Sequence, residues 1–278
     1  MSAEHLLSRD VYDSARRPHP FVEEVVELVR YRDLLFVWSV RNITLRYKRS
    51  VLGVVWTLLE PLILMTILTI VFSSLFRFRI ANFPIYLLSG LLLFSFFSRS
   101  TSQMVEEIIS SQSLAKRIYV PRSIFALAAL ISYFVNWCIA LIPLVGIMLV
   151  LDAPISWSLL SVPAGMLMTA IFAFGIGLIV ATVGAFFHDV QLMYSVLLTA
   201  WFYATPIFYP VEIVPDKYKV FLLSNPLFYL CSLVRDPVWI GEVASVEAWL
   251  MGGAFSLIAA GVGWWVFTHY RDAVDYTL

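Results

Sequence analysis

The fold is decided by residues 123–151, SIFALAALISYFVNWCIALIPLVGIMLVL, which contain no Asp, Glu, Lys or Arg. At a rise of 1.5 Å per residue, a helix of this length crosses the roughly 30 Å of hydrocarbon in a bilayer. Further apolar runs of sufficient length lie at 54–76, 80–98, 157–187, 190–211 and 248–268. We therefore predict an all-α, polytopic membrane protein with six transmembrane helices.

The composition excludes other classes of protein. Of the 278 residues, 60% are hydrophobic and only 14% are charged, whereas a soluble domain carries about a quarter charged residues. A soluble enzyme and a disordered chain are both excluded, and a net charge of zero gives no reason to expect a nucleic-acid partner. Cys138 and Cys231 have no metal-ligand spacing, so no metal site is predicted.

The distribution of basic residues predicts the orientation. Thirteen of the 19 Lys and Arg lie before the first span, between the second and third spans, or after the sixth, and five lie on the opposite side. By the positive-inside rule, the side with thirteen is cytoplasmic. We therefore expect both termini in the cytoplasm, with a polar N-terminal segment at 1–33 and a short tail at 271–278.

Residues 34–48, LLFVWSVRNITLRYK, have the pattern of a helix that lies in the membrane interface. One helical face carries Phe36, Val40, Ile43 and Tyr47. Another carries Arg41, Thr44 and Lys48, which are suited to lipid phosphates. Basic residues that merely flank a span would account for the charge but not for the apolar face, so we predict a cytoplasmic interface helix.

Two of the predicted connections have unusual composition. The cytoplasmic segment 106–121 is amphipathic and too polar for the membrane core, which fits either a helix gripped by a soluble partner or an ordinary solvated loop. The external segment 211–235 mixes prolines with two apolar pieces that are too short to span. Such pieces are typical of re-entrant or interfacial helices, which would form an outer gate, whereas a simple folded loop is the alternative.

Glu60 and the aromatic residues are the candidate functional features inside the spans. A carboxylate at bilayer depth is costly unless it is paired or hydrated, so Glu60 is expected to reach interfacial water or a basic neighbour, rather than to relay protons. Aromatic rings suit sugar binding because each combines a flat apolar surface with a polar rim. Lipid-facing belts and helix packing are the alternative for any single ring.

Several catalytic motifs are missing from the chain. There is no G-x-x-x-x-G-K-[ST] phosphate-binding loop, and we find neither a Ser/His/Asp constellation nor a metalloprotease motif. We therefore predict that the chain is not an enzyme, and that the energy for any transport comes from ions or from another subunit.

Several ordered motifs carry a family resemblance. The main one is RNITLRYKRSVLGVVWTLLEP at 41–61, and it is followed by YLLSGL at 86–91, KRIYVP at 116–121, FFHDV at 186–190, WFYATPIFYP at 201–210 and NPL at 225–227. Together they resemble the ABC type-2 permeases that export polysaccharides, the family of the O-antigen, teichoic-acid and capsule exporters. The resemblance covers roughly 31–270, and one departure from the family pattern is Glu60, where a neutral residue commonly precedes the proline.

The resemblance implies partners and roles for particular residues. Two permease copies would assemble with two ABC nucleotide-binding ATPase subunits, which would hold ATP and Mg, so this chain would need no cofactor. The segment 106–121 would seat a coupling helix in the ATPase, through Ser113, Lys116, Arg117 and Tyr119. The interface helix would contact membrane lipids and the diphosphate of the substrate, through Arg41, Arg46, Lys48 and Arg49.

The resemblance also implies an aromatic channel and a substrate. The implied lining residues are Trp56, Phe94, Phe97, Trp201, Tyr203, Phe208 and Tyr209. A lipid-linked polysaccharide, O-antigen-like or a teichoic-acid or capsule polymer, would pass from the cytoplasmic to the outer face of the bacterial inner membrane. The alternative is an ABC type-2 exporter of a small hydrophobic drug or lipid. An ion-coupled transporter is disfavoured because the spans carry no network of acids and no inverted repeat is seen.

Overall fold

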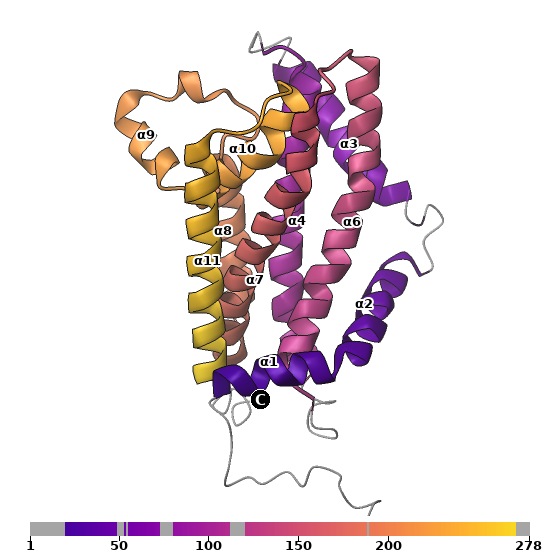
Figure 1. The fold of residues 1–278 in the computed structure, drawn as a ribbon, viewed down its shortest axis with the longest axis vertical. Helices are drawn as coiled ribbons and strands as arrows, with labels where there is room; N and C mark the ends of the chain where they lie inside the picture. Colours follow the sequence, from indigo (N-terminus) through magenta and orange to yellow (C-terminus); the bar gives the residue numbers. More distant parts are fainter. Residues whose placement is uncertain are drawn as a thin grey trace, which may run out of the picture.

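The computed structural model describes residues 20–48, 53, 55–72, 80–111, 120–187 and 189–270, and these ranges form helices joined by turns and loops, with no strand among them. The all-α prediction is thus confirmed for the described part of the chain. Most of the helices stand side by side in one bundle (Figure 1). The α-helices are α1 (Pro20–Arg30), α2 (Arg32–Tyr47), α3 (Val55–Ile70), α4 (Phe83–Ser110), α6 (Ser123–Val150), α7 (Val162–Phe186), α8 (Val190–Ala204), α9 (Asp216–Leu223), α10 (Pro226–Trp239) and α11 (Val246–His269). Two short 3-10 helices are η4 (Trp157–Ser161) and η5 (Val211–Ile213).

Four helical segments are long and apolar enough to cross a membrane, namely α4, α6, η4 with α7, and α11. Three of them coincide closely with the spans expected at 123–151, 157–187 and 248–268. The helices α3 and α8 are also apolar, but they are 16 and 15 residues long. At 1.5 Å per residue they reach roughly 22–24 Å, which is less than the hydrocarbon thickness.

The ends of several predicted spans were wrong. The span expected at 80–98 is the helix α4, which continues to Ser110 because no Pro or Gly follows Ser98 within it. Helix α4 thereby includes the first residues of the predicted coupling segment 106–121. The span expected at 190–211 ends at Ala204, because Pro206 restricts the residue before it and lacks a backbone N–H. Thr205 is accordingly extended. The predicted end of the first span, at 76, lies outside the described residues.

The polar segment expected at 1–33 contains an additional helix. Helix α1 lies across the end of the bundle (Figure 1) and contacts both α6 and α11. Pro20 at its first position and Glu23 in its first turn both favour a helix start. Helix α2 then covers the range expected for the interface helix and packs along α6.

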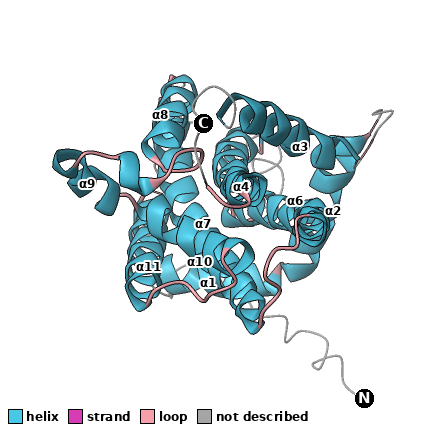
Figure 2. Ribbon diagram, turned by 90° about the horizontal axis from the view of Figure 1, so that it is seen from above, coloured by secondary structure: helices cyan, strands magenta, loops and turns pink. Residues whose placement is uncertain are grey.

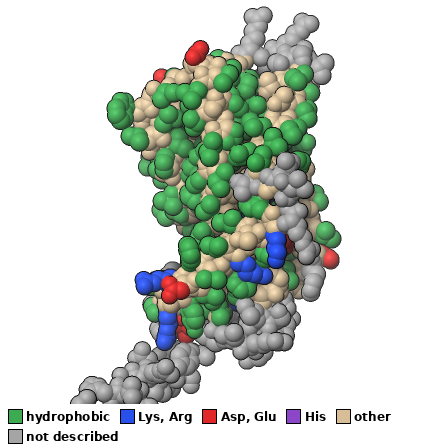
Figure 3. Space-filling view, turned by 90° about the vertical axis from the view of Figure 1, so that its right-hand side faces the viewer, with side chains coloured by type: hydrophobic (Ala, Val, Ile, Leu, Met, Phe, Trp, Pro, Cys, Tyr) green, Lys and Arg blue, Asp and Glu red, His purple; other side chains and the backbone are tan. Residues whose placement is uncertain are grey.

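Helix α4 is the centre of the bundle, where it packs between α6 and α7 (Figure 2). Its side chains Ile85, Leu87, Leu88 and Phe97 are entirely buried. Around this core the outer surface is apolar, as Figure 3 shows for one face, while the charged side chains on that face gather toward the two ends. This distribution is the one that a bilayer imposes.

Helices α7 and α11 approach closely because small residues line their contact. A Cβ atom added to Gly263 would collide with the backbone of Gly175, and one added to Gly175 would collide with the backbone of Ala259. Small residues at such crossings allow two membrane helices to pack backbone against backbone. By contrast, a Cβ atom added to Gly261, on the same helix as Gly263, would meet nothing within 4 Å.

We predict that Gly263→Ala destabilises the protein and that Gly261→Ala does not. The methyl group added at position 263 would force the α7 and α11 backbones apart, and overpacking of this kind costs about 1–3 kcal/mol. The measurement is the thermal unfolding temperature of the purified protein in detergent. Equal unfolding temperatures for the two variants would contradict the close α7–α11 contact.

Candidate functional site

A cavity of about 230 Å³ lies among α3, α4 and α6 and reaches α8. We call it the inner pocket. Its polar lining residues are Thr57, Glu60, Ser95, Ser98, Arg99, Tyr133 and Asn136. Its aromatic lining residues, apart from Tyr133, are Phe94, Phe96, Trp137 and Phe202. So many polar groups among apolar helices mark a place where the bundle accommodates something other than lipid tails.

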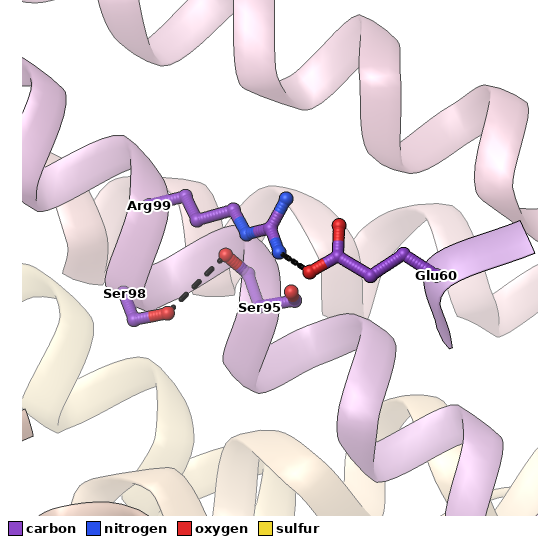
Figure 4. Close-up of polar contacts among 4 residues, drawn as sticks. All are labelled: Glu60, Ser95, Ser98 and Arg99. Atoms are coloured by element: carbon purple, nitrogen blue, oxygen red, sulfur yellow. Dashed lines mark hydrogen bonds and ion pairs between the residues drawn. The ribbon is translucent and has the colours of Figure 1, made fainter. Parts of the chain in front are cut away.

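Glu60 and Arg99 form an ion pair across the inner pocket (Figure 4), in which Arg99 Nη2 donates to Glu60 Oε1. The two side chains are 42% and 46% exposed, respectively. Helix α3 therefore presents its acid to the basic neighbour on α4 that such an acid requires. Ser98 Oγ, one residue from Arg99, donates to the carbonyl oxygen of Ser95 at 3.4 Å.

Helix α2 is fastened to the bundle by polar contacts near the same pocket. The Tyr47 hydroxyl donates to Asn136 Oδ1 and lies 2.8 Å from Thr57 Oγ1. Near the middle of α2, Trp38 Nε1 donates to Glu107 Oε2 at 3.0 Å. Of the residues expected on one face of this helix, Phe36 and Val40 are exposed, whereas the Tyr47 hydroxyl has its partners inside the bundle.

Two of the three described basic residues assigned to the phosphate interface, Arg41 and Lys48, line the same surface hollow on α2, whereas Arg46 does not. Arg41 is exposed and its guanidinium lies 4.2 Å from the centre of the Trp38 ring. Lys48 is exposed, whereas Arg46 points inward, 3.7 Å from the centre of the Tyr133 ring. Arg49 lies outside the described residues. Contact of these residues with lipid phosphates stays a prediction.

The proposed coupling residues lie outside the described part of the chain. Ser113, Lys116, Arg117 and Tyr119 fall within 112–119, which follows the end of α4 and precedes Val120. Ser123, at the start of α6, donates to Glu24 Oε1 of α1. Coupling by these residues stays a prediction.

The predicted channel residues differ in how far their side chains are buried. Phe94 lines the inner pocket, with its ring centre 5.1 Å from that of Phe202, whereas Phe97 is fully buried against Phe172 and Trp201. Sequence reasoning missed Phe202, although it lies in the same aromatic run as its neighbours.

The remaining channel candidates are more accessible. Trp56 on α3 is 52% exposed and Tyr203 on α8 is 61% exposed. Trp201, Phe208 and Tyr209 are partly buried. In this conformation Phe97 is a core residue, while the other six reach the surface or a cavity, and their role as a lining stays a prediction.

The predicted external gate segment at 211–235 contains η5, α9 and most of α10, which ends at Trp239. Asn225 joins this segment to the end of α8, because its Oδ1 accepts from Trp201 Nε1 at 2.8 Å and its Nδ2 donates to Thr205 Oγ1 at 2.9 Å. Its Oδ1 also accepts from the backbone N–H of Leu227 and so caps the start of α10.

Arg235 joins the same segment to α4. Its guanidinium is buried, donates to the carbonyl oxygen of Pro206 at 2.8 Å, and lies 3.9 Å from the centre of the Tyr86 ring. The Tyr86 hydroxyl also donates to the carbonyl oxygens of Pro206 and Tyr209. One end of α4, the turn after α8 and helix α10 are thereby held as one unit.

The comparisons with known proteins agree with this arrangement. Residues 33–239 match the family model described as the ABC-2 type transporter. The chain belongs to this family. The match runs from α2 to the end of α10 and includes both the inner pocket and the external segment.

Three proteins named for export or transport are similar in sequence to this chain over most of its length. The O-antigen export system permease protein RfbA of Klebsiella pneumoniae is 28% identical over 207 residues, which cover 73% of this chain and 79% of that protein. The RfbA protein of Myxococcus xanthus is 27% identical over 254 residues, or 89% and 96% of the two chains. The polysialic acid transport protein KpsM of Escherichia coli is 26% identical over 246 residues, or 84% and 92%.

A second cavity, of about 630 Å³, lies beside α10 and contains Glu212, Ser232, Asp236 and Trp239 among its lining residues. Burial raises the pKa of Asp236 to about 6, although the neighbouring Arg235 opposes the shift and Glu242 adds to it. A carboxyl group whose pKa is raised by folding contributes stability below its unfolded pKa, and that stability is lost as the pH rises through the folded pKa.

We predict that the external segment is less stable at pH 7.5 than at pH 5, and that Asp236→Asn removes most of this difference. The amide avoids the cost of a buried negative charge, so the variant should unfold a few degrees higher than the wild type at pH 7.5. Thermal unfolding at the two pH values measures the effect. An unchanged pH dependence in the variant would show that Asp236 is not its source.

Proposed function

We propose that this chain is the permease subunit of an ATP-driven exporter that moves a lipid-linked polysaccharide across the bacterial inner membrane. The observation that carries the proposal is the similarity over most of their length to permeases named for O-antigen export and polysialic acid transport. The polymer is proposed to be O-antigen-like, or a teichoic-acid or capsule polymer.

The proposed assembly contains two copies of this chain and two ATPase subunits, which bind ATP and Mg. The shorter helices α3 and α8 complete a set of six spans, with local thinning of the bilayer or flanking polar residues making up the missing length. The beginning of α1 and the end of α11 lie at the same end of the bundle. This arrangement supports termini on one side, and the excess of basic residues assigns that side to the cytoplasm.

The proposed mechanism couples ATP binding in the partner subunits to passage of the glycan between the membrane helices. ATP binding closes the partner subunits, and the segment around 113–119 transmits this motion to α4. Helix α2 contacts the diphosphate of the substrate through its basic residues, since guanidinium and ammonium groups bind phosphate oxygens strongly. The glycan then passes the aromatic rings of α3, α4 and α8, and no bond in the substrate is broken.

Depletion of the protein from its native cells tests the proposed function. We expect full-length lipid-linked glycan to accumulate on the cytoplasmic leaflet while surface glycan falls. The measurement is the amount and sidedness of the glycan, determined with a membrane-impermeant reagent in intact and in opened cells. Normal surface glycan without internal accumulation would contradict polysaccharide export and would favour a small hydrophobic drug or lipid as the substrate.

We predict that Lys116→Glu with Arg117→Glu uncouples ATP hydrolysis from export. The reversed charges should weaken the contact with the ATPase, while the spans and membrane insertion are unaffected. Surface glycan and the ATPase activity of isolated membranes are the two measurements. The matched control is Arg30→Glu with Arg32→Glu, a double reversal of exposed charges where α1 meets α2. Export that is equally reduced in both double variants, or unchanged in both, would contradict a specific coupling role.

A further inference from the structure

One buried hydrogen-bond donor at the inner pocket has no acceptor. Trp137 lines the pocket and is 2% exposed, yet its indole N–H is buried without an acceptor. An indole N–H can only donate, and a buried donor without an acceptor costs free energy. The pocket therefore favours a ligand that brings acceptor atoms.

Two guanidinium groups lie at the pocket or beside it. Arg99 lines the pocket, and the Arg46 guanidinium lies 3.7 Å from the centre of the ring of Tyr133, which also belongs to the lining. Glu60 is the acidic side chain that lines the pocket, and it pairs with Arg99. Arg46 forms no ion pair with a described residue, and its Nη1 is buried without an acceptor. Two guanidinium groups thus share one carboxylate.

The pair between Glu60 and Arg99 is built so that another anion can replace the carboxylate. A single contact between Arg99 Nη2 and Glu60 Oε1 joins them, which leaves the other donors of the guanidinium available. A phosphate or carboxylate takes two donors of a guanidinium at once. Both side chains are nearly half exposed, so a second anion can reach the pair.

The position of the pocket suits a group that arrives with the transported molecule. The pocket adjoins the contact through which Tyr47 of α2 reaches Asn136 and Thr57. It also reaches Phe94 on α4 and Phe202 on α8, two of the helices that carry predicted channel rings. Its volume of about 230 Å³ is several times the roughly 30 Å³ that one water molecule takes in the liquid, which leaves room for an oxyanion.

We propose that the inner pocket binds an oxyanion of the transported molecule, with Arg99 as its principal ligand and Glu60 as the counter-ion that it displaces. The assignment of the oxyanion to the transported molecule rests on the proposed function. The oxyanion is a phosphate of the lipid carrier or a carboxylate of the glycan, since both offer the same pair of oxygens to a guanidinium.

The test is equilibrium binding to the purified full chain in nanodiscs, with farnesyl diphosphate as the phosphate probe and a glucuronate trisaccharide as the carboxylate probe. Glu60→Gln frees Arg99 and is expected to strengthen binding about threefold. Arg99→Gln is expected to weaken binding about tenfold. Arg99→Lys keeps the charge but loses the forked geometry, so its affinity should fall between those of wild type and Arg99→Gln.

If the ion pair were merely structural, the Glu60 and Arg99 variants would not change the affinity for the probes in opposite directions. The control variants are Glu247→Gln, an exposed acid at the start of α11, and Arg32→Gln, an exposed base at the start of α2. Neither should change the affinity for either probe. If Arg99→Gln does not fold, as judged by gel filtration, Glu60→Gln and Arg99→Lys still carry the comparison.

The result that overturns the proposal is a change in the same direction for both Glu60→Gln and Arg99→Lys, or no change for either with both probes. The probe that shows opposite effects identifies the source of the oxyanion. Binding is measured without export, so a failure of polysaccharide export in depleted cells would refute the proposed function separately from the anion site.

Discussion

The packing of α4 between α6 and α7 is the interaction on which the rest of the structure depends. The helix is buried over most of its length, and it also contacts α3, α8 and α10. Residues of α4 contribute to each functional feature. The Tyr86 hydroxyl donates to the backbone that precedes the external segment, and Phe94 and Arg99 line the inner pocket. Glu107 accepts a hydrogen bond from the Trp38 indole of α2. A single continuous helix therefore connects the external segment to the end of the bundle from which the predicted coupling segment follows.

The polar groups inside the bundle follow from the cost of placing them in hydrocarbon. Arg99 lies in the part of α4 that apolar helices surround, and Glu60 is the acid that it reaches. Arg235 is buried at the other end of α4 and satisfies part of its guanidinium with carbonyl oxygens after α8 and with the face of Tyr86. In both places an arginine stabilises a contact between elements distant in sequence.

The apolar runs predicted the all-α class and the positions of α6, α7 and α11, because long uncharged stretches have no other stable structure in a membrane. Hydropathy could not predict the end of α4, since a helix continues through polar residues when nothing interrupts its hydrogen bonds. It also missed α1, whose formation depends on packing across the end of the bundle. The sequence indicated that Glu60 needs a basic neighbour, but the identity of that neighbour as Arg99, 39 positions away, depends on how α3 lies against α4.

Transport into membrane vesicles tests directly whether this chain exports a polysaccharide. The measurement is the ATP-dependent appearance of lipid-linked glycan inside inside-out membrane vesicles that contain this chain and its ATPase partner. We expect the glycan to become protected from an added glycosidase only when the chain, the ATPase and ATP are all present. Glycan that stays accessible under these conditions, in vesicles shown to be sealed and to hydrolyse ATP through the complex, would contradict export of a polysaccharide by this permease.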